Sequence, residues 1–147
     1  WMVVSAQFSL LAWVAFITWG AYFLSGITSQ SAIREAISFT AGIIAGAIII
    51  LANAILTPTL GANSLPVVVG VAGFIIILLE LVPWFNMAPG YFLGAAAFFA
   101  AGAKPDLATL SAVWIPGMLG LGLGILTAYL RALVFKFEGV VDPLKNK

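Results

Sequence analysis

The sequence predicts an all-α, polytopic membrane protein that forms a single domain over residues 1–147. Hydrophobic residues make up 63% of the chain and its mean hydropathy is +1.18, too apolar for a soluble domain of this size to bury. Charged residues make up only 7% and fall mainly between or after long apolar runs. Runs near 20 residues match the ~30 Å hydrocarbon core of a bilayer at ~1.5 Å per residue. The expected spans are residues 8–26, 36–56, 67–82, 88–102 and 107–135.

Local chemistry predicts where several of these helices begin and end. Ser31, in the polar turn after the first span, is the expected N-cap of the second helix, with Glu35 as an acid in its first turn. The second helix is expected to stop at Pro58, before an uncharged linker. Pro66 suits the first turn of the third helix, and Asp106 is the expected N-cap of the last.

The segment 88–102 is short, rich in glycine and alanine, and opens with Pro89 and Gly90. One interpretation is a Pro/Gly-broken segment whose exposed backbone meets a solute, which is tolerated at membrane depth only under protein or beside water. The alternative is a tightly packed helix, because Gly90 and Gly94 form a small-xxx-small pair that allows close approach of backbones.

An internal repeat is suggested by two pairs of similar segments. Residues 20–26 resemble residues 90–94, and Gly42-Ile-Ile-Ala-Gly46 resembles Gly120-Leu-Gly-Leu-Gly124. Residues 1–5 are apolar and are interpreted as the end of a preceding membrane helix, with a cleaved signal peptide as the alternative. Three segments per half then predict a 3+3 inverted repeat, as in transport proteins with a site near the midplane. Chance recurrence of common membrane residues is the competing explanation.

The distribution of cations predicts the orientation in the membrane. Four of the six cations lie at or beyond the last helix: Arg131, Lys136, Lys145 and Lys147. The positive-inside rule therefore places the C-terminus and the tail 136–147 in the cytoplasm. Counting back through five crossings puts Arg34 inside and Lys104 outside.

The composition excludes several classes of function. The chain has no histidine and no cysteine, which removes the usual metal ligands, proton shuttle and thiol nucleophile. Its five carboxylates show no spacing typical of a metal site, and a net charge of +1 offers no footprint for nucleic acid. We therefore expect no enzyme activity, no cofactor, no metal and no nucleic-acid partner.

Glu80 is the only ionisable residue well inside an apolar run, and an intramembrane acid is by default a functional hypothesis. The alternative is that it lies near the cytoplasmic interface, three residues before Pro83. Aromatic residues near the repeat suit a constriction, although such residues more often form interfacial belts. The candidate pore or solute-lining residues are Tyr22, Phe23, Glu80, Asn86, Gly90, Tyr91 and Phe92. The expected helix-packing residues are Gly42, Gly46, Gly94, Gly120 and Gly124.

Two motifs point to a known family. With Trp19-Gly-Ala-Tyr-Phe23 and Ala88-Pro-Gly-Tyr-Phe-Leu-Gly-Ala-Ala-Ala-Phe-Phe99, the chain resembles the bacterial inner-membrane family catalogued as domain of unknown function 1097. The resemblance covers nearly the whole chain and implies a bacterial inner-membrane location and a further helix before Trp1, but no activity. Glu80, Lys104 and Asp106 are not part of the family pattern. A looser similarity in style is to small neutral-solute channels, such as urea channels.

The expected function is a channel or facilitator for a small, mostly neutral solute. An ion-coupled transporter is less favoured, because Glu80 is the only acid that the sequence places within a span. The alternative is a structural or accessory membrane subunit that packs on a larger complex. In either case the expected partners are the lipid bilayer and further copies of the chain or other membrane subunits.

Overall fold

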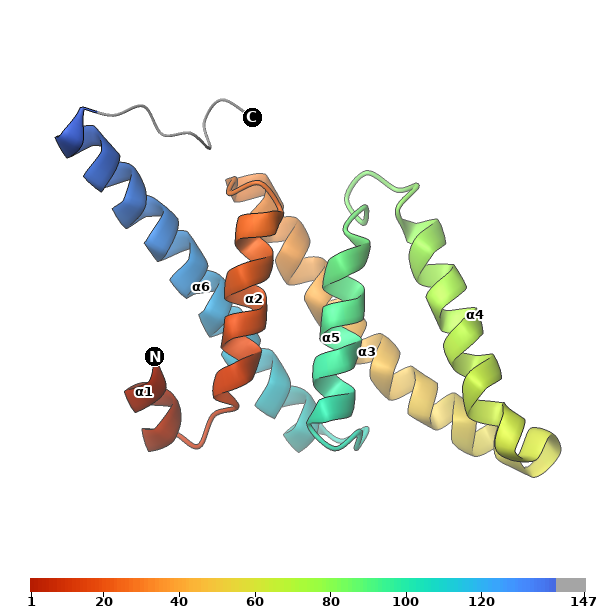
Figure 1. Ribbon diagram of the computed structural model, residues 1–147. Helices are drawn as coiled ribbons and strands as arrows, with labels where there is room; N and C mark the ends of the chain where they lie inside the picture. Colours follow the sequence, from red (N-terminus) through yellow and green to blue (C-terminus); the bar gives the residue numbers. More distant parts are fainter. Residues whose placement is uncertain (140–147) are drawn as a thin grey trace.

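The computed structural model describes residues 1–139, and these contain helices and no strand (Figure 1). The helices are α1 (Met2–Gln7), α2 (Ala12–Leu24), α3 (Ser29–Leu60), the 3-10 turn η1 (Gly61–Asn63), α4 (Ser64–Leu79), α5 (Ala88–Ala100) and α6 (Leu107–Glu138). The all-α prediction is therefore confirmed. The predicted tail 136–147 falls partly in the end of α6, and Lys145 and Lys147 lie outside the described residues.

The helix α3 begins earlier and ends later than predicted. Its N-cap is Thr28, whose hydroxyl accepts from the Ser31 amide at 3.0 Å while the Ser31 hydroxyl accepts from the Thr28 amide at 2.9 Å. The prediction that Ser31 is the N-cap is wrong, because Ser31 is the third residue of this reciprocal capping box. The prediction of a stop at Pro58 is also wrong, because Pro58 lies inside α3, which continues to Leu60 without the hydrogen bond of the missing N–H.

The segment after α4 forms one uninterrupted helix. Pro89 lies in the first turn of α5, where its missing N–H is no loss, and the helix runs continuously to Ala100. The prediction of a break within residues 88–102 is therefore wrong. The predicted cap at Asp106 is confirmed, since its Oδ1 accepts from the Thr109 amide at 2.7 Å.

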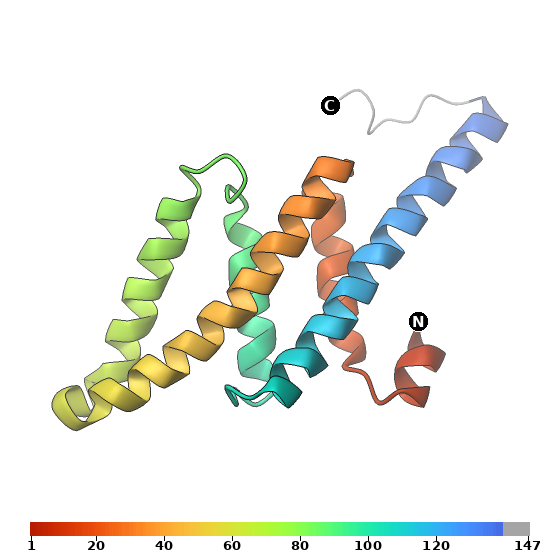
Figure 2. The same cartoon turned by 180° about the vertical axis from the view of Figure 1, so that it is seen from behind.

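Successive helices from α2 to α6 alternate in direction, and the two long helices, α3 and α6, run antiparallel with a common tilt (Figures 1 and 2). The short helix α2 packs mainly on α6, and the short helix α5 packs mainly on α3. The starts of α3 and α5 and the ends of α4 and α6 lie at the upper end in Figure 1. Arg34, Glu80 and Lys136 belong to that end, whereas Lys104 belongs to the opposite one.

Glycines set the distance between each short helix and its long partner. Gly42 of α3 lies directly on the backbone of Tyr91, and Gly94 of α5 lies on the backbone of Phe39. In the other pair, Gly120 of α6 lies on the backbone of Ala15. A side chain at any of these glycines would overlap main-chain atoms, so the helices approach as closely as backbones permit.

The two pairs of helices that follow each other in the chain, α2–α3 and α5–α6, have the same helix lengths and similar connecting turns. Both short helices have 13 residues and both long helices have 32. After α2 the chain turns through Gly26 (φ 104°) and Ile27 (φ 57°), and after α5 through Gly102 (φ 107°) and Ala103 (φ 55°). The following N-caps, Thr28 and Asp106, have backbone angles within 2° of each other, φ −114°/ψ 159° and φ −116°/ψ 158°.

The core lies where the four helices α2, α3, α5 and α6 meet. Its fully buried side chains include Val14, Phe39, Phe98 and Val113, one from each of the four helices. The Phe39 ring lies against Gly117, and the Thr18 hydroxyl donates to the Gly117 carbonyl at 2.7 Å. Buried aromatic and aliphatic side chains from all four helices fill this junction.

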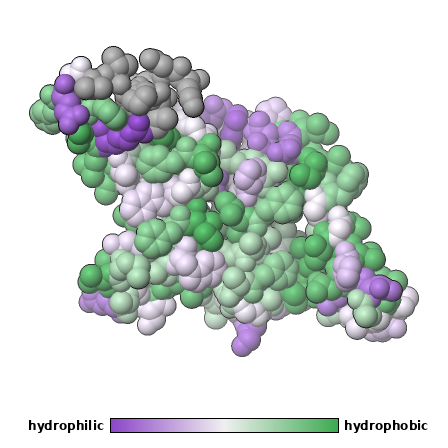
Figure 3. All heavy atoms as spheres, viewed as in Figure 1, coloured by the Kyte–Doolittle hydropathy of each residue, from purple (hydrophilic) through white to green (hydrophobic). Residues whose placement is uncertain are grey.

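The outer surface of the helices is strongly apolar. Two helical stretches, Ser29–Leu79 and Leu107–Glu138, are long and apolar enough to cross a membrane by length and composition. Only 33% and 17% of their most apolar windows are buried, whereas the core helix of a soluble protein is mostly buried. Figure 3 shows mainly hydrophobic residues across the middle of one face and hydrophilic residues at its upper and lower edges. This distribution suits helices surrounded by lipid.

We predict that Gly120→Ala destabilises the fold, because the added methyl group would meet the Ala15 backbone, which has no room to move aside. The expected cost is about 1–3 kcal/mol, as for other overpacked contacts. Gly122→Ala is the matched control on the same helix, since nothing lies near its added methyl group. Thermal denaturation midpoints in detergent compare the two variants, and equal midpoints would contradict the packing described here.

We predict that the cap at Asp106 makes stability depend on pH. Hydrogen bonds from the backbone and side chain of Thr109, with a smaller effect of Lys104, lower the pKa of the Asp106 carboxyl from its ordinary value of 3.8. Its stabilising contribution is therefore present above pH 3.8 and is lost as the pH falls through the lowered value. Asp106→Asn keeps a capping side chain but cannot titrate. Wild type should unfold at a higher temperature than this variant near neutral pH, and the difference should shrink in acid.

Candidate functional site

The most unusual residue of the interior is Glu35, in the second turn of α3. Its side chain is only 2% exposed, and its Oε1 has no hydrogen-bond partner among the described residues. Burying a carboxylate is costly unless it is paired or hydrogen-bonded, so such a group needs an explanation. It lies about 9 Å along the helix axis from Ser29, at ~1.5 Å per residue.

Glu35 sits between two contacts of α3. Three residues before it, Ala32 packs with Tyr22 of α2 and Leu121 of α6. Three residues after it, Ser38 lies against Gly90 at the start of α5. The Ser38 hydroxyl donates to backbone carbonyls of its own helix, to that of Arg34 at 2.8 Å and to that of Glu35 at 3.2 Å. Glu35 is therefore buried on the stretch of α3 between its contact with α2 and α6 and its contact with α5.

Two further buried polar atoms lack partners in the described part of the chain, Arg34 Nε and the Tyr91 hydroxyl. Arg34 precedes Glu35, and one helical step of ~100° turns it toward a different neighbour. Its guanidinium lies 5.8 Å from the centroid of the Trp84 ring, in the loop between α4 and α5. Arg34 thus faces the α4 side of α3, whereas Glu35 faces the core.

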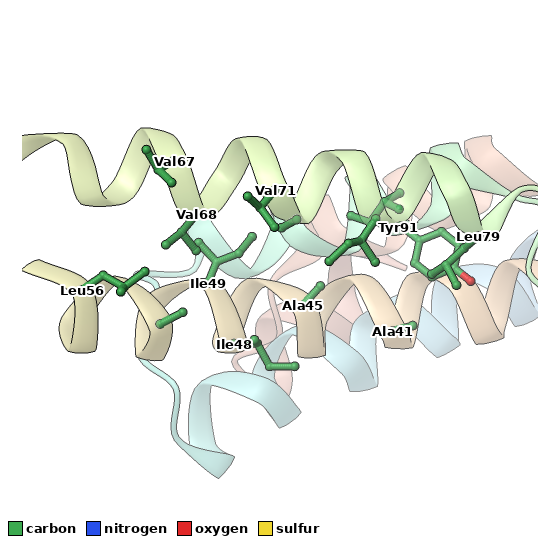
Figure 4. A pocket seen from close by; sticks show the side chains of 14 residues that line it. Ala41, Ala45, Ile48, Ile49, Leu56, Val67, Val68, Val71, Leu79 and Tyr91 are labelled. Carbon is green, nitrogen blue, oxygen red and sulfur yellow. The ribbon is translucent and has the colours of Figure 1, made fainter. Parts of the chain in front are cut away.

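An apolar cleft of about 400 Å³ separates α3 from α4 (Figure 4). Its α3 wall consists of small and aliphatic side chains: Ala41, Ala45, Ile48, Ile49, Ala52 and Leu56. Its α4 wall runs from Val67 to Leu79. Tyr91 of α5 lies at one end, and in Figure 4 its hydroxyl points past Leu79, toward the start of α3.

The residues that the sequence placed near a pore fall into two groups. Three are exposed: Glu80 at the C-cap of α4, Asn86 in the following loop and Phe92 on the outer side of α5, 46% exposed. The others are at least partly buried. Gly90 lies against Ser38, and Phe23 is half-buried and packs edge-on to Tyr22 at 6.1 Å between ring centroids.

The two tyrosines are both buried but belong to different clusters. Tyr22 packs with Ala32 and Leu121, whereas Tyr91 packs with Ile76 and Ala88 beside α4. The structure therefore does not gather them into one lining. The five glycines expected to mediate packing all lie at helix contacts, Gly46 against Phe98 and Gly124 against Tyr22 in addition to the three described above.

Glu35 was missed as a site residue because it was assigned to the exposed first turn of a shorter helix. The signal was present in its spacing. Small or polar residues recur every three or four positions along one face of α3: Ser31, Glu35, Ser38, Gly42 and Gly46. A stripe of this kind is typical of a helix–helix contact inside a membrane, and an acid within it is therefore expected to be buried.

The chemistry available at this site is that of a single carboxylate. Among the described residues no cluster of three metal-ligating side chains is found. An unpaired carboxylate accepts hydrogen bonds and attracts cations, so the site suits a ligand that donates N–H or O–H groups.

The comparison with known families decides the family of the chain. The sequence model of a family described as "protein of unknown function (DUF1097)" matches residues 1–135. The chain belongs to the DUF1097 family. The resemblance seen in the sequence motifs is thereby confirmed, although the family description assigns no activity. No curated protein and no solved structure matches this DUF1097 chain.

We predict that Glu35 and Glu80 differ sharply in accessibility, and the absence of native cysteine allows a direct test. The thiol of Glu80→Cys should react at once with a water-soluble maleimide, because this position is exposed. The thiol of Glu35→Cys should react at least about tenfold more slowly, since reaction requires local opening of the helix contact. Labelling in denaturant shows that both thiols are competent, and equal rates in the folded protein would contradict the burial of Glu35.

Proposed function

We propose that this DUF1097 protein is a multi-pass protein of the bacterial inner membrane, with its C-terminus in the cytoplasm. The apolar, largely exposed faces of its long helices support a location in lipid. The placement of Arg34 and Lys136 at one end and Lys104 at the other agrees with the positive-inside rule. Glu80 then lies at the cytoplasmic end of α4, near the headgroups.

The chain is also proposed to contain an inverted repeat that pairs α2–α3 with α5–α6. The equal helix lengths and matching turns support it, as does the equivalence of contacts. Gly42 meets Tyr91 as Gly120 meets Ala15, and Gly46 meets Phe98 as Gly124 meets Tyr22. This register keeps the expected match of Gly42 and Gly46 with Gly120 and Gly124. It replaces the expected match of residues 20–26 with 90–94, because helix α2 is offset from α5 by 76 positions.

The function that we favour is that of a channel or facilitator for a small, mostly neutral solute. The observation that carries it is the buried Glu35 side chain, whose Oε1 has no hydrogen-bond partner among the described residues. It lies on α3 between the contact of Ala32 with α2 and α6 and the contact of Ser38 with α5. A solute with N–H donors, such as an amide, would satisfy that carboxylate, and its hydrogen bonds would replace those lost from water. Glu35 thereby takes the selecting role that the sequence suggested for Glu80.

Passage through the four-helix junction requires the Phe39 ring to move. Phe39 fills the space over Gly117, one turn beyond Glu35 along α3. Gly117 has no side chain to hold the ring in place, so a change in the Phe39 rotamer is the simplest opening movement. The described conformation is then the closed state of the facilitator.

The alternative function is a structural or accessory membrane subunit, and the solid junction favours it. A scaffold needs no path, and the exposed leucines of α6, among them Leu119, Leu126 and Leu130, offer a face for another membrane protein. Its Glu35 would then serve only to fix how α2, α5 and α6 meet α3.

We predict that the purified full chain raises the urea permeability of vesicles, measured by stopped-flow light scattering. Glu35→Gln should lower that permeability about tenfold, because it replaces an acceptor oxygen with an NH₂ donor, and a buried group left without its hydrogen bond costs ~1–3 kcal/mol. Phe39→Ala should raise the permeability, because it removes the ring that closes the junction.

Glu80→Gln is the matched control and should behave as wild type, because its carboxylate is exposed at a helix end. Glycerol, which is similar in size but lacks N–H donors, tests the selectivity. Wild-type vesicles no more permeable than empty vesicles to urea, glycerol and methylammonium would exclude the facilitator and leave the subunit.

A further inference from the structure

We propose that the cleft between α3 and α4 is a binding site for one anionic membrane phospholipid, with an acyl chain in the cleft and the phosphate near Arg34. The inference rests on the proposed membrane location but not on solute transport. It concerns residues of α3 other than Glu35, which does not line the cleft, so the two sites are separate.

The body of the cleft suits an acyl chain. Its volume is about 400 Å³. On the α3 side, the short side chains of Ala41, Ala45 and Ala52 leave this space open. These residues recur at spacings of four and seven, so the small side chains form a continuous stripe along the helix. The cleft runs between two helices that cross the proposed bilayer, which gives it the direction of a lipid tail.

One end of the cleft carries hydrogen-bond donors without acceptors. The Tyr91 hydroxyl lies there, on a side chain only 1% exposed and without a partner. Arg34 lies seven residues before Ala41 and therefore on the same face of α3, two turns nearer the cytoplasm. Its buried Nε also lacks an acceptor, and Trp84 holds its guanidinium at this end. Both groups can donate hydrogen bonds and the rest of the cleft lining is aliphatic, so a fitting ligand bears acceptors at this end only.

Such a ligand is apolar along its length and rich in oxygen at one end, as a phospholipid is. A helix from a second copy would fill the apolar part but leave both donors unsatisfied at its cytoplasmic end. In residues 1–139 no acid is paired with Arg34, and the nearby Glu80 is exposed at the end of α4. A phosphate at the cytoplasmic headgroup level supplies the negatively charged partner that Arg34 lacks within the described residues.

The test measures lipid retained per protomer by native mass spectrometry, after purification of the full chain from vesicles of phosphatidylglycerol and phosphatidylcholine. The wild-type protein should retain more phosphatidylglycerol than phosphatidylcholine. Arg34→Gln should reduce that preference about fivefold, the equivalent of the ~1 kcal/mol that one cation contributes near an anionic surface. Ala45→Leu, or Ala52→Leu if the first variant does not fold, should lower the retention of both lipids.

Matched controls exist for both changes. Arg131→Gln removes another cation of the same end, which is also stacked on an aromatic ring, 5.1 Å from the Phe135 centroid, but lies outside the cleft. Gly122→Leu adds apolar bulk of similar size to an open face of α6. Both controls should leave lipid retention and headgroup preference as in wild type.

Four results would overturn the proposal. Unchanged retention in a folded cleft-filling variant would show that no lipid occupies the cleft. A cleft-filling variant that alters the oligomeric state instead would identify a second copy as the occupant. An equal loss of preference in Arg34→Gln and Arg131→Gln would show general surface attraction rather than a site.

Failure of the chain to enter vesicles at all would reject the membrane location itself, on which the lipid site rests. A chain that enters vesicles but does not raise their urea permeability would contradict the proposed transport function and leave the lipid site intact.

Discussion

The structure depends on the direct contact of backbones at Gly42, Gly94 and Gly120. In the proposed bilayer, apolar helices have no strong hydrophobic drive to associate, so stability would rest on how closely the helices pack. Each short helix meets its long partner through these glycines, and the pairing crosses over, α2 with α6 and α5 with α3. Each helix of 13 residues is thereby packed against a helix of 32 residues.

The same close approach determines which polar groups are buried. Glu35 and Arg34 are neighbours in sequence, but one helical step directs the first into the four-helix junction and the second toward α4 and Trp84. A single turn of α3 therefore supplies an acceptor to one environment and a donor to another. Arg34 Nε and Glu35 Oε1 have no hydrogen-bond partner among the described residues. The proposed ligands would supply an acceptor to the first atom and a donor to the second.

The packed junction forms a closed interior, whereas the apolar cleft between α3 and α4 is open. Phe39 and Phe98 fill the interior, and α4 stands away from α3 along the cleft. Helix α5 packs on Phe39 through Gly94 and contributes Tyr91 to the cleft. A lipid in the cleft, as proposed, would therefore contact the same helix, α5, as the Phe39 ring. Transport and lipid binding are thus separate proposals that share one structural element, the α3–α5 contact.

The sequence alone determined the helical class, the family, the positions of the apolar runs and the cap at Asp106, because each depends on local composition or on neighbouring residues. The glycine spacings that mediate packing could be read in the same way. Tertiary structure decided that Glu35 is buried and that Glu80 is exposed. Beside Arg34 and Ser31, Glu35 has the local pattern of a solvated first turn, whereas Glu80 follows an apolar run. The burial of Glu35 accompanies contacts of its neighbours on α3, Ser38 with Gly90 and Ala32 with Tyr22 and Leu121. These partners are distant in sequence, and no local pattern around Glu35 encodes them.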